Sequence, residues 1–407
     1  MLEILEKLIK IVFWKGKFME ENMESTAKDY KYKVELVTDI NDMGVQYTDS
    51  KRPIRKVLRN GKRGYFKTNL GIRLKDYKAT KQSAAHFGEF IAYKLAEKID
   101  LPVCEIELVK RNLALKYSKT GKSVEVPGCI SYVDLKQGES FIPAATILSW
   151  YKMEHKKEFE AIVNEAGNLQ AGDYRLDPNN EVNNNNIELI IPAFEAYARE
   201  QWHMSEEEVD QIRQNIINMV VFDCKFANRD RNDENYGLST TADGKVKFYP
   251  IFDNEYILGL AEFEEDILKY SGPRLQEHID TDLYSVMGVT SKPTKLGYQA
   301  MLSALFLNNP EETKKATDLV MQIEEKDLTE IMDECEGLSE LHKAYALRIF
   351  RSRQRGFETL IEEYVDEKGQ MIEQTLPGKK PMELGASRGG SSGRKSPTVR
   401  EFGEFGE

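Results

Sequence analysis

The sequence lacks the patterns that mark several common protein classes. Its four cysteines, Cys104, Cys129, Cys224 and Cys335, form no CxxC pair, which argues against a zinc ribbon and a redox motif. Cysteines this widely spaced in 407 residues are expected to be reduced thiols in the core of a cytoplasmic protein. The net charge of −11 lacks the basic excess of proteins that bind a nucleic-acid backbone, so direct nucleic-acid binding is not expected.

Long apolar runs are also missing, both within the chain and near its N- and C-termini. No run reaches the roughly 18 residues of a membrane-spanning helix, so we expect no transmembrane segment. Leu and Ile recur at helical spacing in residues 1–28, but Glu3, Glu6 and Lys7 interrupt them, unlike in a secretory signal. We predict a docking helix in this N-terminal extension, with a membrane-surface helix as the alternative. Residues 377–407 are rich in Gly, Ser, Lys and Arg and are predicted to be a disordered tail.

The hydrophobic pattern between the ends changes from strand-like to helical near Phe141. Before it we predict one helix at residues 80–98 and strands or hairpins at residues 31–37, 55–68, 103–109, 113–117 and 128–133. After it we predict a hairpin turning at Asp243-Gly244 and helices at residues 144–166, 187–203, 205–226, 294–308, 311–323, 327–335 and 338–365. Segregated elements of this kind indicate an α+β fold with an N-lobe at 29–135 and a C-lobe at 136–376.

Three polar residues after the apolar helix at 205–226 suggest a reaction. Asp230 and Asn235 have the spacing D-x-x-x-x-N, and Asp253 follows after a predicted hairpin that returns the chain toward them. Phosphoryl transfer uses one carboxylate to orient and deprotonate the acceptor hydroxyl, and an amide oxygen and a second carboxylate to hold Mg²⁺. We therefore predict Asp230 as the catalytic base and Asn235 and Asp253 as metal ligands.

A cation and a carboxylate in the first half of the chain fit the same chemistry. Lys67 lies on the second strand of the first predicted hairpin, where its charge could neutralise nucleotide phosphates. Glu89 lies in the next helix, in line with Ala85, Ala92 and Ala96. Small neighbours allow this face of the helix to approach the sheet, so we predict that Glu89 orients Lys67, with Glu97 as a competing candidate.

These residues resemble the HipA-like serine/threonine kinases, which are related to protein and phosphatidylinositol kinases. The resemblance spans roughly residues 55–350 and includes a hinge at Ser131, Tyr132 and Val133, followed by Gly138-Glu139. It implies a two-lobed protein-kinase-like fold, a β-rich N-lobe with one helix, and a mostly helical C-lobe. It also implies ATP and Mg²⁺ as cofactors, nucleotide binding at Lys67 and the hinge, and transfer of the γ-phosphate to a protein hydroxyl, including one on the chain itself.

Three departures from the family pattern stand out. A G-x-G-x-x-G loop is absent, and only Gly44 and residues 46–53 could cover phosphates. Asp253 is followed by Asn254-Glu255 instead of Phe-Gly, and Asn228 stands where the catalytic loop usually has His. A switch built on that Phe is therefore absent or different.

Other interpretations compete with this one. By itself the Asp230–Asn235 loop could be an Asx-rich surface turn, whereas an EF-hand is excluded because Gly at position six and Glu at position twelve are missing. Arg229 is expected to anchor the loop through a carboxylate. At the level of function, the alternatives to a protein kinase are a non-catalytic nucleotide-binding or partner-binding module and a lipid or small-molecule kinase. The intact trio of Asp230, Asn235 and Asp253 favours catalysis.

Overall fold

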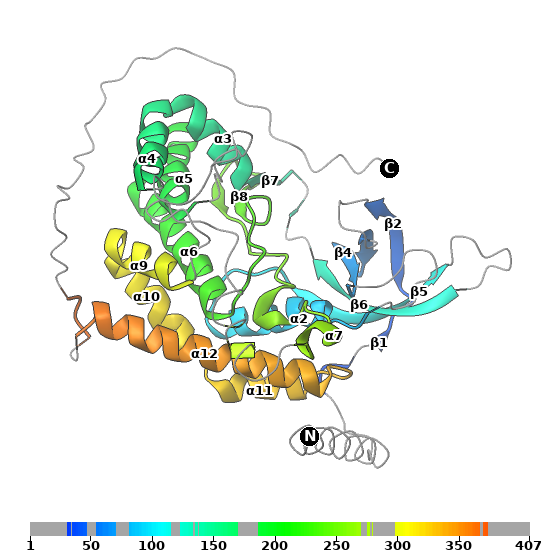
Figure 1. The fold of residues 1–407 in the computed structure, drawn as a ribbon. Coiled ribbons are helices and arrows are strands. Elements are labelled where there is room, and N and C mark those ends of the chain that lie inside the picture. Colours follow the sequence, from blue (N-terminus) through cyan, green and yellow to red (C-terminus); the bar gives the residue numbers. More distant parts are fainter. Residues whose placement is uncertain are drawn as a thin grey trace, which may run out of the picture.

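The computed structural model describes residues 31–33, 35–46, 54–70, 81–114, 123–132, 135–136, 138–169, 186–269, 275–276, 279, 298–366 and 369–372. The predicted N-terminal helix, the predicted tail and the hinge residue Val133 lie outside these residues. The described chain forms a β-rich lobe followed by a mostly helical lobe, which confirms the α+β, two-lobed prediction (Figure 1).

The N-terminal lobe is built on a sheet whose described strands follow the order β1-β5-β6-β4-β3-β2, and only the β1–β5 pair is parallel. The strands are β1 (Glu35–Leu36), β2 (Ile40–Gln46), β3 (Ile54–Arg59), β4 (Lys62–Thr68), β5 (Ile106–Ala114) and β6 (Ser123–Tyr132). The predicted hairpin is confirmed, because Asn60 and Gly61 turn the chain with φ angles of 51° and 76°.

Two strand predictions need correction. The strand expected over residues 31–37 is reduced to the two residues of β1. The two strands expected on either side of Asn112 form the single strand β5, because the register with β6 runs unbroken from Ile106 to Ala114. Pairing with β6 therefore continues through the polar Asn112, while residues 115–117 of the second expected strand lie outside the described residues.

Helix α2 (Ala85–Lys98) packs on one face of this sheet and begins five residues later than predicted. The side-chain oxygen of Asn69 accepts hydrogen bonds from the Ser83 hydroxyl at 2.8 Å and from the Ala85 amide at 3.0 Å. These contacts hold the chain in a non-helical conformation before the first turn. Gly88 allows α2 to approach residues 254–256, because a Cβ at Gly88 would lie 2.4 Å from the carbonyl oxygen of Glu255.

The C-terminal lobe combines helices with a small sheet of order β7-β8-β9. Its main elements are β7 (Ser140–Pro143), α3 (Ala144–Glu154), α4 (Lys156–Leu169), α5 (Ile187–Trp202), α6 (Glu206–Lys225), β8 (Gly237–Thr240), β9 (Val246–Phe248), the 3₁₀ turn η1 (Ile257–Gly259), α7 (Glu264–Ile267), α9 (Tyr298–Asn308), α10 (Pro310–Met321), α11 (Glu325–Asp333) and α12 (Glu340–Tyr364). The helix expected at 144–166 is wrong as a single element, because the chain breaks at His155 into α3 and α4. The predicted capping box of Ser205 and Glu208 at the start of α6 is confirmed.

Two apolar clusters lie on opposite faces of the N-terminal sheet. The larger continues from α2 through the helices of the C-terminal lobe, and the smaller includes Val57, Phe66 and Ile130 on the far face. Side chains alternate along a strand, so Lys67 points to the α2 face while Phe66 points away from it. The four cysteines are buried thiols that form no disulfide with one another, as predicted. None of the described helices is long and apolar enough to cross a membrane.

Candidate active site

A buried cation joins two carboxylates where the lobes meet. The ammonium of Lys67 on β4 lies 2.5 Å from a carboxylate oxygen of Glu89 on α2 and 2.8 Å from one of Asp253, which follows β9. The Glu89 side chain is 0% exposed and that of Lys67 is 9% exposed, whereas Asp253 is 29% exposed. Because charges are rarely buried unless they are paired, Lys67 provides the counter-charge that makes Glu89 tolerable in this position.

Local contacts bring Asp253 toward the helix. The second oxygen of Glu89 accepts a hydrogen bond of 2.9 Å from the backbone amide of Asn254. Asp253 itself has a φ of 57°, in the left-handed region that an aspartate visits more readily than most residues. The turn at Asp253 and the hydrogen bond at Asn254 together direct the Asp253 side chain to Lys67.

The predicted catalytic loop begins where α6 ends, at Ala227 with a φ of 52°. Asn228 donates to Asp223 at 2.9 Å and accepts from the amide of Asp230 at 3.2 Å. The Asn235 amide group donates to the carbonyl oxygen of Asp230 at 3.0 Å. Such bonds also occur in an Asx-rich surface turn, but Asn228 and Asn235 are 1% and 6% exposed, which places this loop in the interior.

Arg229 and Arg231 occupy different environments although they are two residues apart. Arg229 forms an ion pair with Glu262, which confirms the prediction that it anchors the loop through a carboxylate. Arg231 is fully buried and donates to both oxygens of Asp223, at 2.8 and 3.1 Å. It also donates to the carbonyl oxygens of Asn235 at 3.1 Å and Phe252 at 2.8 Å, and to the side-chain oxygen of Asn254.

Sequence reasoning missed Arg231. A signal for it was present, since Asp223 stands in the otherwise apolar stretch Val220–Cys224 of α6 and requires a partner when that face is buried.

The carboxyl group of Asp230 has a raised pKa. Burial is the main cause, and the negative charge of Asp253 adds to it, while Asn232 and the neighbouring arginines oppose it. A carboxylate whose pKa moves toward neutrality is a better general base than an ordinary aspartate. The predicted base and the predicted metal ligand are thus electrostatically coupled.

The hinge residues are placed on different faces of the sheet. Ser131 is buried and pairs in register with Tyr65 on the face of Lys67 and α2. The Tyr132 ring belongs to the apolar cluster on the far face, and its hydroxyl donates to Glu107 at 2.5 Å. The Tyr132 ring thus lies on the face opposite Lys67, and its backbone is the part of this residue that could face a nucleotide beside Lys67.

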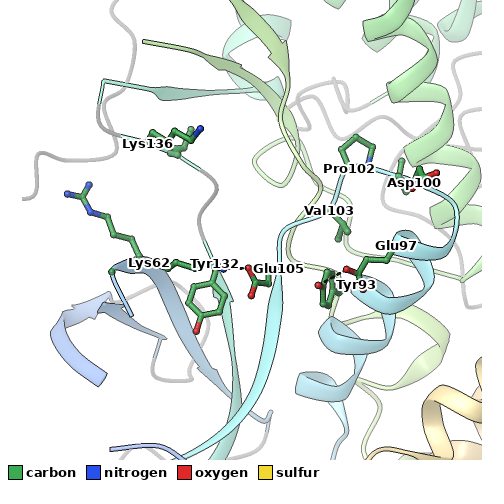
Figure 2. Close-up of a pocket in the computed structure, with 13 residues that line it drawn as sticks. Lys62, Tyr93, Glu97, Asp100, Pro102, Val103, Glu105, Tyr132 and Lys136 are labelled. Carbon is green, nitrogen blue, oxygen red and sulfur yellow. Dashed lines mark hydrogen bonds and ion pairs between the residues drawn. The ribbon is translucent and has the colours of Figure 1, made fainter. Parts of the chain in front are cut away.

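A cavity of about 890 Å³ lies near the hinge, but the charged cluster does not line it. Its walls come from the β3–β4 turn, the end of α2 and the hinge, with Lys62 and Tyr132 opposite Tyr93 and Glu97 (Figure 2). Lys67, Glu89, Asp230, Asn235 and Asp253 are not among its lining residues. We therefore assign the chemistry to the residues around Lys67 and not to this cavity.

The residues around Asp253 suit a hard divalent cation. Glu89, Asp253 and Glu255 each place a carboxylate oxygen within 4.8 Å of the others. The Asn235 nitrogen is used on the Asp230 carbonyl, which leaves its side-chain oxygen as the atom that could face a metal. Carboxylate and amide oxygens are ligands that Mg²⁺ prefers. We did not predict Glu255 as a metal ligand from the sequence, where it stands at the position of Gly in the Asp-Phe-Gly pattern of the family.

The two lobes, with the charged residues between them, have the architecture of a protein-kinase-like fold. No protein-family model matches the sequence, and no curated protein matches it. Among solved structures, the chain is similar to CtkA, a proinflammatory kinase of Helicobacter pylori, with 15% identity and a TM-score of 0.56 over 82% of this chain and 99% of CtkA. At this identity the likeness shows the fold, and it confirms the predicted protein-kinase-like architecture.

Two further structures align with lower scores. HipA of Shewanella oneidensis, from a complex with HipB and operator DNA, is 11% identical, with a TM-score of 0.37 over 84% of this chain and 70% of HipA. A Golgi casein kinase is 10% identical, with a TM-score of 0.33 over 79% of this chain and 73% of the kinase.

Proposed function

We propose that the protein is an ATP- and Mg²⁺-dependent serine/threonine protein kinase of the HipA-like type, which transfers the γ-phosphate to a protein hydroxyl, its own included. The observation that carries the proposal is the contact of Lys67 with both Glu89 and Asp253. Structural ion pairs also occur in cores, but this one joins a strand, a helix and the segment after the catalytic loop at the junction of two kinase-like lobes.

Each residue has a role that its surroundings support. Asp230 would accept the proton of the acceptor hydroxyl, which its raised pKa favours. Lys67, oriented by Glu89, would contact the nucleotide phosphates. Asp253 and the side-chain oxygen of Asn235 would hold Mg²⁺, which supplies positive charge to offset that of the phosphates. The backbone of the hinge at Ser131 and Tyr132 would receive the adenine.

The decisive experiment incubates the full chain with γ-labelled ATP and Mg²⁺ in three samples: alone, with casein as a generic protein acceptor, and with phosphoinositide vesicles. We expect label in protein, on the chain itself or on casein, and none with Asp230→Asn. Arg351→Lys, on the exposed face of α12, is the matched control and should behave like the unchanged protein. Nucleotide binding without any transfer would support the non-catalytic module, and label confined to added phosphoinositide vesicles would support the lipid kinase.

A further inference from the structure

Arg231 is buried beneath the candidate site and hydrogen-bonds to residues that form it. Its side chain is 0% exposed, and its hydrogen bonds reach four residues in three segments of the chain: Asp223 on α6, Asn235 in the catalytic loop, and both neighbours of Asp253. Phe252 offers its carbonyl oxygen to one guanidinium nitrogen and Asn254 its side-chain oxygen to the other. The two residues predicted to bind metal, Asn235 and Asp253, are thus held through a single side chain.

We propose that Arg231 is a positioning residue that sets the distance between Asn235 and Asp253, with Asn254 as its partner on the Asp253 side. This inference deepens the proposed function and depends on it for its catalytic readout. Its physical basis is the planar fork of the guanidinium, which fixes several acceptors in one geometry. Lysine keeps the charge, but its single ammonium cannot reproduce the fork.

The charge of Arg231 is secured by Asp223. Burial, the largest single effect, lowers the pKa of the guanidinium, but the charge and hydrogen bonds of Asp223, together with the charges of Asp253 and Glu89, outweigh it, and the pKa of Arg231 lies above its ordinary value. The bidentate pair therefore orients the guanidinium and leaves its remaining N–H groups directed at Asn235, Phe252 and Asn254. Asp223 and Arg231 act as one unit, with α6 as the fixed base.

The test compares Arg231→Lys, Asn254→Ala and Asn254→Asp with Arg351→Lys, the same substitution in an exposed arginine–glutamate pair. For Arg231→Lys we expect kcat to fall about 100-fold, because a displacement of about 1 Å in a catalytic site has that effect. The Mg²⁺ concentration for half-maximal activity should rise, while the affinity for ATP measured without Mg²⁺ should stay unchanged. Asn254→Ala, which loses one hydrogen bond to a charged group, should raise the Mg²⁺ requirement about tenfold. Asn254→Asp keeps the acceptor and should restore it.

A role in stability alone predicts a different pattern. The variants would then unfold at lower urea, but their folded molecules would keep the Mg²⁺ requirement and kcat of the unchanged protein. Should Arg231→Lys fail to fold, the pair Asn254→Ala and Asn254→Asp decides, since the first removes the acceptor of one hydrogen bond and the second keeps it. An unchanged Mg²⁺ requirement in Asn254→Ala would overturn the proposal.

Hydrogen exchange separates this proposal from the proposed function. In the nucleotide-free protein, Arg231→Lys should speed amide exchange in residues 228–237 and 250–256 and leave α5 and α10 unchanged. If the unchanged protein transfers no phosphate, the proposed function fails, and this exchange pattern still decides the positioning role. Unchanged exchange in both segments would overturn it.

Discussion

Replacing Lys67 by methionine should destabilise the folded protein by about 3–5 kcal/mol, the usual cost of removing one partner of a buried ion pair. The structure explains the size of the effect. Without the ammonium, the oxygens of Glu89 and Asp253 face each other within 4.8 Å. At an effective dielectric constant of about 20, two unit charges at that distance repel by about 3 kcal/mol. The 29% exposure of Asp253 weakens this repulsion, so we expect the lower end of the range.

The matched control is Lys62→Met on the same strand. Lys62 and Glu105 also lie 2.5 Å apart, but their side chains are 57% and 48% exposed. Exposed pairs contribute less than about 1 kcal/mol, so Lys62→Met should change the free energy of unfolding by no more than that. Urea unfolding followed by circular dichroism measures the free energy of unfolding of both variants. The nitrogen–oxygen distance to Glu is the same in both pairs, so the difference between the two losses reports on burial.

A double-mutant cycle with Glu89→Leu completes the test. Glu89→Leu leaves the Asn254 amide without its acceptor, at a cost of about 1–3 kcal/mol, but it also removes the buried negative charge. The double variant should therefore lose clearly less than the sum of the single losses, with a coupling of about 2–3 kcal/mol. Additive losses, or a Lys67→Met effect no larger than that of Lys62→Met, would refute the reasoning.

Four further predictions concern the site and the tail. Asp230→Ala should abolish transfer but preserve nucleotide binding, whereas Asp253→Ala should lose Mg²⁺-dependent binding as well; equal transfer in both variants and the unchanged protein would contradict the roles. Because burial and then Asp253 raise the pKa of Asp230, kcat should decline on the acid side at a higher pH than for an ordinary aspartate. A raised carboxyl pKa costs folding free energy above that pKa, so Asp230→Asn should raise the urea midpoint at pH 7 and not at pH 3. Deleting residues 379–407 should leave the melting temperature unchanged, and any self-phosphorylation should place phosphate between Ser387 and Thr398, as mass spectrometry can show.

Elements specified by short stretches of sequence could be predicted. The Asn60-Gly61 hairpin and the capping box of α6 depend on residues a few positions apart, and both form as expected. The stripe of alanines around Glu89 also carried information, since Ala85, Ala92 and Ala96 are all 0% exposed. A helix face this small can approach a sheet, which is why Glu89 reaches Lys67.

Features that depend on distant partners could not be predicted. Arg229 and Arg231 look alike in the sequence, yet one pairs with Glu262 near the surface and the other is fully enclosed. The two arginines differ because Arg231 pairs with Asp223, which lies on α6 one turn before the loop. Residues 252–254, which follow β9, then pack against Arg231 and accept its remaining hydrogen bonds. The break between α3 and α4 could not be predicted either, because no Gly or Pro lies at this position in the sequence.

Asn254 stands directly after Asp253, where the family pattern has Phe, and its contacts hold the Asp253 segment in place. Its backbone amide binds Glu89 and its side-chain oxygen binds Arg231, and the residue is 1% exposed. Swinging Asp253 out of the site would break both hydrogen bonds in a buried setting, each worth about 1–3 kcal/mol when lost. An outward conformer would therefore be a rare state, since a penalty of a few kcal/mol leaves it at a few percent or less.

We therefore expect the backbone amide of Asn254 to exchange slowly. Its hydrogen exchange in the nucleotide-free protein should match that of the α6 core, such as Val220 and Val221, because the bond to Glu89 should open only when the lobe junction opens. In Glu89→Gln the amide keeps an acceptor but Lys67 loses its charged partner, so exchange at Asn254 should rise in step with the loss of stability. Fast exchange at Asn254 in a protein whose α6 amides remain protected would show that the Asp253 segment moves independently, and the switch would then be different from that of the family and not absent.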